Sequence, residues 1–271
     1  MRMRKIRLDV LLVERGFAES RTLAQRLVMA GQVRVGGEVV LRSAKNFPLD
    51  APVEVEHGPR FVSRGGEKLE AALRAFGVNI TGCVCADVGA STGGFTDCLL
   101  QYGAAKVYAI DVGQGILEWK LRQDPRVVVM ENTNARYIEH LPEPVGIITI
   151  DASFISLKVL LPVVKRWLTS PITPQGSSEG TVIALIKPQF EAGRAEVGRG
   201  KGVIRDPAIH RQVLLEVLKY AQLQGFVAKG LIRSPISGPK GNIEFLTWLE
   251  SFDEHPNVVE ALVDAVLSGV S

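Results

Sequence analysis

The first part of the chain carries two stretches of helical hydrophobic spacing, followed by two short alternating runs. Residues 7–15 predict a helix that ends at Gly16, and residues 20–31 predict a second helix with Ser20 as its N-cap. Residues 32–41 predict a β-hairpin, because the glycine pair at its centre tolerates positive φ. The inward face of the second helix is predicted to carry Leu23, Leu27 and Val28.

From residue 64 onward, continuous apolar runs alternate with helical spacing. The runs predict seven strands, at 83–88, 106–110, 127–130, 145–150, 181–186, 226–233 and 243–249. Helices are predicted at 66–76, up to residue 101, at 207–225 and at 257–269. This alternation favours an α/β fold, in which a doubly wound, mostly parallel sheet carries helices on both faces.

The two patterns divide the chain into a small α+β domain at residues 1–59, a linker at 60–64 and a large α/β domain at 65–271. Residues 189–206 are rich in glycine and arginine and have little periodicity. Because they follow the carboxyl end of a predicted parallel strand, we expect a mobile loop at the mouth of a site, with a disordered surface loop as the alternative.

The composition is that of a globular protein with a sizeable core, with 46% hydrophobic and 23% charged residues. No apolar run approaches the roughly 18–20 residues that span a bilayer, and the basic N-terminus lacks the apolar segment of a signal peptide. The three cysteines form no disulfide framework and the four histidines are scattered, so neither a metal nor a membrane is predicted as a partner. We expect buried cysteines and a cytoplasmic protein.

Positive charge is concentrated at the start of the chain. Residues 1–47 carry ten Lys and Arg against four acidic residues, although the net charge of the whole chain is only +3. Such an uneven distribution predicts an anionic partner for the first domain, with a solvated basic face as the alternative. Arg21 and Arg26 are predicted to face outward on the second helix, beside Arg34 of the hairpin.

The same segment contains the pattern R-L-D-x-L-L-x-x-R-G, followed by S-R-x-x-A-x-x-L-x-x-x-G-x-V-x-V-x-G. This pattern, over about residues 6–55, resembles the S4-type RNA-binding domain. The resemblance implies a grip on structured RNA, which agrees with the basic surface. The predicted RNA contacts are Arg7, Arg21, Arg26 and Arg34.

The stretch DVGASTGGFTD, residues 87–97, predicts a nucleotide-binding turn between a strand and a helix. A dinucleotide-binding turn usually reads G-x-G-x-x-G, but Ser91 stands where the second glycine would be. With an acidic residue at the end of the next strand, the turn is closer to that of S-adenosylmethionine-dependent methyltransferases. The predicted cofactor contacts are Asp87, Gly89, Ser91, Thr92, Gly93, Phe95, Asp111, Asn132, Thr133, Asn134 and Asp151.

Charged residues mark the carboxyl ends of two further apolar strands, at Asp151 and Lys187. Ligands bind at this edge of an open α/β sheet. If the last strand is antiparallel, Glu244 at its start would lie beside Lys187. Lys68, on the helix before the first strand, would by itself pass for a solvated lysine. For Phe154, after Asp151, two interpretations stay open, a base-stacking aromatic or a core residue.

Together, these four charged residues resemble the Lys-Asp-Lys-Glu set of FtsJ-like ribose 2′-O-methyltransferases. The segments around them resemble the TlyA/haemolysin A family; these segments are VSRGGEKL, IDASFISL, LIKPQFE and GNIEFL. That family joins an S4-type domain to an FtsJ-like, Rossmann-like methyltransferase domain with a seven-stranded sheet. The resemblance implies methyl transfer from S-adenosyl-L-methionine to the 2′-hydroxyl of cytidine in 16S rRNA, 23S rRNA or both. The implied partner is rRNA or a ribosomal subunit.

The residue types suit this chemistry, since a ribose hydroxyl must lose its proton as it attacks the methyl group. We expect Lys187 to be the base or to position the hydroxyl, Lys68 to supply a second cation, and Asp151 and Glu244 to orient them. Three alternatives are a nicotinamide-dependent dehydrogenase, a non-catalytic RNA-binding or ribosome-assembly protein, and a haemolysin. The replaced glycine of the turn counts against a dehydrogenase, and the four charged residues count against a non-catalytic protein. The lack of a spanning segment counts against a haemolysin.

Overall fold

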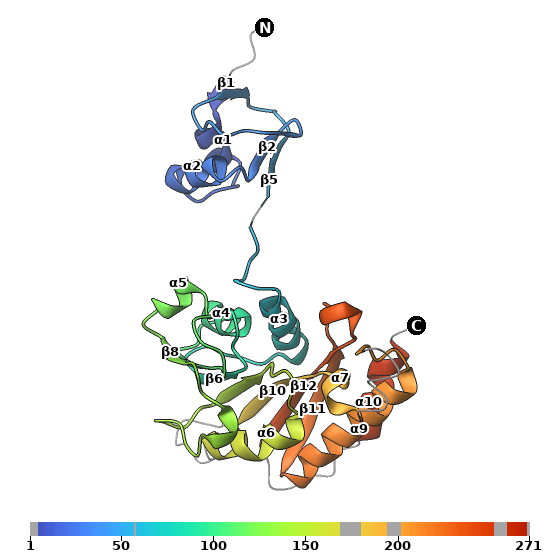
Figure 1. Cartoon of the computed structure of the whole chain (residues 1–271). Coiled ribbons are helices and arrows are strands. Elements are labelled where there is room, and N and C mark those ends of the chain that lie inside the picture. Colours follow the sequence, from blue (N-terminus) through green and yellow to red (C-terminus); the bar gives the residue numbers. More distant parts are fainter. Residues whose placement is uncertain (1–4, 57, 169–179, 194–201, 252–258, 270–271) are drawn as a thin grey trace. The chain divides into compact units, whose positions relative to one another are not determined.

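The computed structural model describes residues 5–56, 58–168, 180–193, 202–251 and 259–269 (Figure 1). The chain divides into two compact units, Met1–Arg60 and Phe61–Ser271. Residues 194–201 of the predicted mobile loop lie outside the described residues. In the part of the chain that the structure describes, no helix is long and apolar enough to cross a membrane.

The first unit packs two helices against short strands. Strand β1 (Lys5–Arg7) pairs with β4 (Asn46–Pro48), and a second sheet has the order β3 (Glu38–Val39), β2 (Val33–Val35), β5 (Val53–Val55). Helices α1 (Leu8–Glu14) and α2 (Arg21–Met29) lie where the periodicity predicts them, and Ser20 caps α2 by accepting a hydrogen bond from the Leu23 N–H. The predicted hairpin is confirmed, with positive φ at Gly36 and Gly37.

One core prediction for this unit is wrong. Leu23 is 38% exposed, whereas Ala24 and Val28 are fully buried and Leu27 is half-buried. The buried stripe of α2 therefore runs through positions 24 and 28, which are four residues apart. Leu23 precedes this stripe by one residue and so points about 100° away from it.

The second unit is built on a seven-stranded sheet with the order β11-β12-β10-β9-β6-β7-β8. Strand β12 runs antiparallel to both of its neighbours, β11 and β10, and the remaining pairs of this sheet are parallel. The strands are β6 (Val84–Val88), β7 (Lys106–Ile110), β8 (Val127–Met130), β9 (Ile147–Ile150), β10 (Thr181–Ile186), β11 (Phe226–Arg233) and β12 (Phe245–Ser251). The predicted α/β fold class is confirmed.

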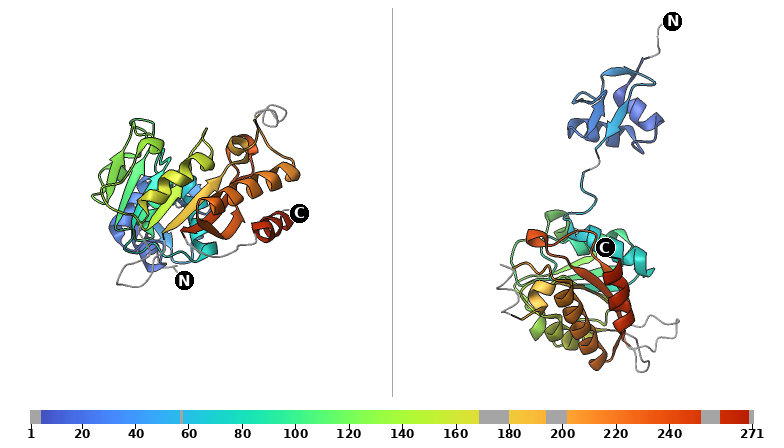
Figure 2. Two further views of the ribbon diagram at one scale, coloured as in Figure 1. Left: turned by 90° about the horizontal axis from the view of Figure 1, so that it is seen from below. Right: turned by 90° about the vertical axis from the view of Figure 1, so that its right-hand side faces the viewer.

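Helices cover both faces of this sheet (Figure 2). One face packs against α3 (Gly65–Phe76), α4 (Gly94–Gln101) and α5 (Trp119–Arg122), and the other against α6 (Leu157–Val164), α9 (Pro207–Leu223) and α10 (Val259–Ser268). Successive strand residues contribute to opposite layers, so that Cys85 belongs to the first core and Ala86 to the second. Cys85 and Cys98 are buried, as the sequence predicts, whereas Cys83 is only half-buried.

This topology brings several chain segments to one edge of the sheet. The carboxyl ends of β6, β7, β9 and β10 meet there. Because β12 is antiparallel to β10, with Phe245 opposite Ile186, the start of β12 lies at the same edge. Residues that follow four strands and precede a fifth are therefore neighbours in space.

Candidate active site

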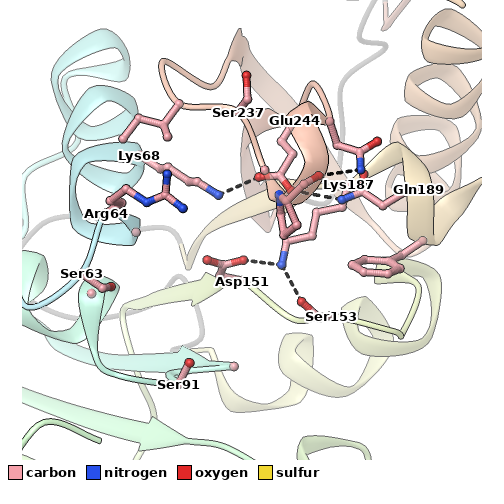
Figure 3. A pocket seen from close by; sticks show the side chains of 18 of the residues that line it. Ser63, Arg64, Lys68, Ser91, Asp151, Ser153, Lys187, Gln189, Ser237 and Glu244 are labelled. Carbon is pink, nitrogen blue, oxygen red and sulfur yellow. Dashed lines mark hydrogen bonds and ion pairs between the residues drawn. The ribbon is translucent and has the colours of Figure 1, made fainter. Parts of the chain in front are cut away.

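Two adjoining cavities open at this edge of the sheet, with volumes of about 1110 Å³ and about 430 Å³. They share Gly89, Ser91, Asp151, Ser153 and Phe154 as lining residues. The larger one, cavity A, is also lined by the other three predicted catalytic residues, Lys68, Lys187 and Glu244 (Figure 3). The smaller one, cavity B, is lined by Asp111, Thr133 and Asn134 together with apolar side chains. The four predicted catalytic residues and most of the predicted cofactor residues thus gather at one place.

The glycine turn after β6 is fixed by close backbone contacts. Gly89 has φ +84°, and a Cβ at this position would lie 2.7 Å from the Asp151 carbonyl oxygen. Only glycine allows the chains after β6 and β9 to approach so closely. Ser91 also has positive φ, and its N–H donates to Asp111 Oδ2 at 2.8 Å. The turn and the end of β7 are therefore joined directly.

Cavity B has the composition of a nucleoside site. The Asp111 carboxylate is held by the N–H groups of Ser91 and Gly113 and stays partly exposed, so each oxygen retains acceptor capacity for a ribose hydroxyl. Val112, Ile116 and Leu160 supply apolar surface for a planar base.

Sequence reasoning missed Glu131, which shapes cavity B from outside it. Its carboxylate accepts hydrogen bonds from the N–H groups of Gly115 and Leu117 and pairs with Arg122. The guanidinium of Arg122 and the backbone N–H groups lower the pKa of Glu131 to about 2. Glu131 thereby holds the 112–117 loop, which carries two of the apolar lining residues. The available signal was its position directly after β8, equivalent to that of Asp111 after β7.

Three predicted cofactor residues line neither cavity, namely Asp87, Gly93 and Asn132. Asp87 is fully buried and accepts hydrogen bonds from Thr96 (2.7 Å) and Thr149 (3.0 Å). A Cβ at Gly93 would overlap the side chain of Leu121. The Asn132 N–H donates to the carbonyl of Gly113. Asp87 therefore lies behind the site, whereas direct cofactor contact of Gly93 and Asn132 stays a prediction. Thr92 and Phe95 line cavity A as predicted.

The four charged residues form two ion pairs in cavity A, drawn as dashed lines in Figure 3. Lys68 Nζ lies 2.6 Å from Glu244 Oε2, and Lys187 Nζ lies 2.6 Å from Asp151 Oδ1. Glu244 therefore contacts Lys68, whereas the sequence pattern predicted Lys187 as its neighbour. Their side chains are between 0% and 21% exposed, so none is an ordinary solvated charge.

Three further residues support these pairs and were missed from the sequence. Ser153 accepts a hydrogen bond from Lys187 Nζ at 2.9 Å, and Gln189 Nε2 donates to Glu244 Oε1 at 3.2 Å. A Cβ at Gly238 would lie 2.0 Å from the same Glu244 oxygen. Ser153 and Gln189 each stand two positions after a predicted catalytic residue, which was the only signal for them.

Phe154 is 89% exposed and has φ +64°, so its interpretation as a core residue is wrong. Its ring centroid lies 4.8 Å from that of Phe190, on α7 (Pro188–Glu191). Both rings line cavity A, and they form an aromatic wall at its mouth.

In the first unit, the predicted RNA-binding arginines have different surroundings. Arg7 and Arg21 meet at the buried carboxylate of Asp9, at 2.9 Å and 3.1 Å. Hydrogen bonds from Arg7 lower the pKa of Asp9 far below its ordinary value. Arg34 pairs with Glu56 at 2.7 Å, and Arg26 is exposed without an ion pair to any described residue.

Comparison with known proteins agrees with this geometry. A family model described as FtsJ-like methyltransferase matches residues 61–251, and an S4 domain model matches residues 6–46. The Bacillus subtilis protein YqxC, provisionally assigned as an rRNA methyltransferase, is 49% identical over 253 residues, covering 92% of this chain and 87% of that protein. The 16S/23S rRNA (cytidine-2′-O)-methyltransferase TlyA of Mycobacterium tuberculosis is 41% identical over 274 residues, covering 99% and 98%.

Among solved structures, a Streptococcus thermophilus protein provisionally assigned as a hemolysin is 43% identical, with a TM-score of 0.73. The match covers 98% of this chain and 96% of that one. The methyltransferase model alone spans well over half of the sequence. The chain belongs to the FtsJ-like methyltransferases, within the TlyA/hemolysin family that joins an S4 domain to the methyltransferase domain.

Proposed function

We propose that this enzyme transfers a methyl group from S-adenosyl-L-methionine to a ribose 2′-hydroxyl of rRNA, at cytidine in 16S rRNA, 23S rRNA or both. The observation that carries the proposal is the convergence of two buried lysine–carboxylate pairs on cavity A, next to a nucleoside-like cavity B. The TlyA relative is named for this reaction, and the S4 domain is a module for RNA.

The residues present fit the cofactor. In this assignment, Asp111 accepts hydrogen bonds from the two ribose hydroxyls, while Val112 and Ile116 pack against the adenine, near Thr133 and Asn134. The turn at Gly89, Ser91 and Thr92 borders cavity A and faces the methionine portion. When bound, the cofactor supplies an electrophilic methyl group on a sulfonium. Asp151 lines both cavities and so lies between donor and acceptor.

Lys187 is the residue we assign to the proton of the 2′-hydroxyl. A neutral lysine has two N–H donors and one lone pair. One donor is directed to Ser153 Oγ, and Asp151 lies at ion-pair distance from the same nitrogen. The lone pair would accept the hydroxyl proton while the ribose oxygen takes up the methyl group that the bound cofactor would supply. Asp151 and Glu244 hold Lys187 and Lys68 in place through ion pairs of 2.6 Å each.

Phe154 and Phe190 are placed to stack on the base of the target nucleotide. Enzymes that modify RNA commonly stack an unpaired base on aromatic side chains. An aromatic ring that is 89% exposed at the mouth of a cavity is otherwise unfavourable in water. This contact would hold the nucleotide while its ribose faces Lys187.

We further propose that residues 1–59 bind rRNA through Arg7, Arg21, Arg26 and Arg34, and that residues 65–271 carry out the transfer, joined by the linker at 60–64. A ribosomal subunit in the cytoplasm is the substrate that suits both parts. Because phosphate contacts dominate such binding, affinity should fall steeply with salt.

The test is tritiated methyl transfer to purified ribosomal subunits from a strain that lacks the enzyme. We expect the label in alkali-resistant dinucleotides, since a 2′-O-methyl group blocks alkaline cleavage. The Lys187→Ala variant should lose about 10²–10⁴-fold in kcat while it still binds S-adenosylmethionine. Label on a base would contradict the proposed reaction, and near-normal transfer by Lys187→Ala at every pH would contradict the assigned base.

A further inference from the structure

Cavity A contains more positive than negative side chains. Among the described residues that line it, four are cations, namely Lys68, Lys187, Arg64 and Lys240, and two are acids. Both acids are already paired, Glu244 with Lys68 and Asp151 with Lys187. Within the described residues, Arg64 and Lys240 have no ion-pair partner. The described part of the cavity wall therefore presents two positive charges that no described carboxylate compensates.

The methyl donor alone does not balance these two charges. S-adenosylmethionine carries one carboxylate against an ammonium and a sulfonium, so it brings a net positive charge itself. A cavity with two further cations would repel it unless an anion binds at the same time. The surplus therefore indicates an anionic ligand in cavity A other than the cofactor.

The backbone at Lys240 points to the same conclusion. Lys240 has φ +57° in the short turn Pro239–Gly241, although its neighbour at 241 is a glycine with φ +82°. A side chain in this conformation costs backbone strain that glycine avoids, and such strain clusters at functional sites. A lysine at this place retains a charge at the cavity where glycine would be the more stable residue.

We propose that Arg64 and Lys240 bind the two phosphates that flank the target ribose, one each. This inference rests on the proposed function, because a nucleotide within an RNA chain carries one phosphate on its 5′ side and one on its 3′ side. Two charges thus meet two charges. Arg64 precedes α3 and lies on the same side of the cavity as Lys68 (Figure 3), whereas Lys240 comes from the turn before β12. Contacts from two separate segments fix the ribose between them.

The experiment uses competition by small probes against methyl transfer to ribosomal subunits. The probes are cytidine 3′,5′-bisphosphate, which carries both phosphates, and cytidine, which carries neither. The variants are Arg64→Gln and Lys240→Asn, since asparagine tolerates positive φ, with Lys240→Arg to retain the charge. Arg166→Gln is the matched control, because Arg166 is exposed beside Trp167, at the amino edge of β9.

We expect the bisphosphate to inhibit the wild type at lower concentration than cytidine. Each charge-removing variant should weaken inhibition by the bisphosphate about tenfold and leave inhibition by cytidine unchanged. Lys240→Arg and Arg166→Gln should behave as wild type, and affinity for S-adenosylmethionine should stay the same. Equal inhibition by the two probes would overturn the inference. A loss of affinity for S-adenosylmethionine in Arg64→Gln would also overturn it, because that result would assign Arg64 to the methionine carboxylate. The assay measures the total methyl label in the RNA, whether it lies on ribose or on base. Failure of this inference can therefore be distinguished from failure of the proposed 2′-O-methylation.

Discussion

Replacing Asp87 by asparagine should make the stability of the methyltransferase unit less dependent on pH. The Asp87 carboxyl lies on β6 and is fully buried. Burial raises its pKa from 3.8 to about 7, and the charge of Asp151 raises it by a smaller amount. The hydroxyl groups of Thr96 and Thr149 donate hydrogen bonds to the carboxylate and lower the pKa in part. Asparagine has nearly the same shape and is uncharged at every pH.

The sign follows from proton binding in the two states. Below pH 3.8 the carboxyl is protonated in both the folded and the unfolded chain. Between pH 3.8 and about 7 the unfolded chain releases the proton while the folded chain keeps it, so the free energy of unfolding falls by about 1.4 kcal/mol per pH unit. Above that window both states are ionised and the accumulated loss is about 4 kcal/mol. Stability from this group is therefore lost as the pH rises.

The measurement is urea unfolding of wild type and Asp87→Asn at pH 5, 6, 7 and 8, followed by tryptophan fluorescence. All three tryptophans lie in the methyltransferase unit, so the signal reports on that unit alone. The variant should gain about 3 kcal/mol relative to wild type between pH 5 and pH 8. Glu139→Gln, at an exposed carboxyl, serves as the control and should show no such change. Parallel stability curves for wild type and Asp87→Asn would refute the reasoning.

Three other substitutions test separate parts of the molecule. Asp111→Ala should lower affinity for S-adenosylmethionine about tenfold or more in isothermal titration, because it removes a charged acceptor; unchanged affinity would exclude it from the ribose site. Glu244→Ala should cost about 3–5 kcal/mol of unfolding free energy in urea, since it leaves the buried Lys68 charge without its partner; a loss below 1 kcal/mol would show that water replaces the carboxylate. Arg26→Gln should reduce the salt dependence of rRNA binding by about one unit of slope in filter binding, and an unchanged slope would remove Arg26 from the RNA surface.

Strand positions in the methyltransferase unit could be predicted closely from the sequence. The bounds of β7, β8, β10 and β11 agree with the predicted runs. The clearest case is β10, in which all six residues are buried and which ends where Lys187 follows, because strands buried on both faces are nearly continuous in hydrophobicity. Leu23 shows the limit of the same reasoning. A short amphipathic helix offers two overlapping apolar stripes, and the packing of its neighbours decides between them.

The site was predictable wherever topology alone places a residue. Asp151 and Lys187 follow adjacent parallel strands, so any such sheet brings them together. Which of these charged residues form ion pairs with one another depends on how deeply each side chain is buried and where it points. Hydrophobic periodicity gives neither. The burial of Lys68 against Glu244 arises from the packing of α3 beside β12, and the burial of Asp87 from hydroxyls on two other elements. Residues separated by 176 positions leave no local trace of their contact.

The position of Asp151 suggests how cofactor binding prepares the proposed base. Its carboxylate lines both cavities and holds the Lys187 ammonium at 2.6 Å. A sulfonium bound nearby competes with that ammonium for the same negative charge, and like charges in a partly buried site disfavour each other. A single carboxylate thus couples the two halves of the site, because it borders the cofactor cavity and the acceptor cavity and holds the proposed base between them.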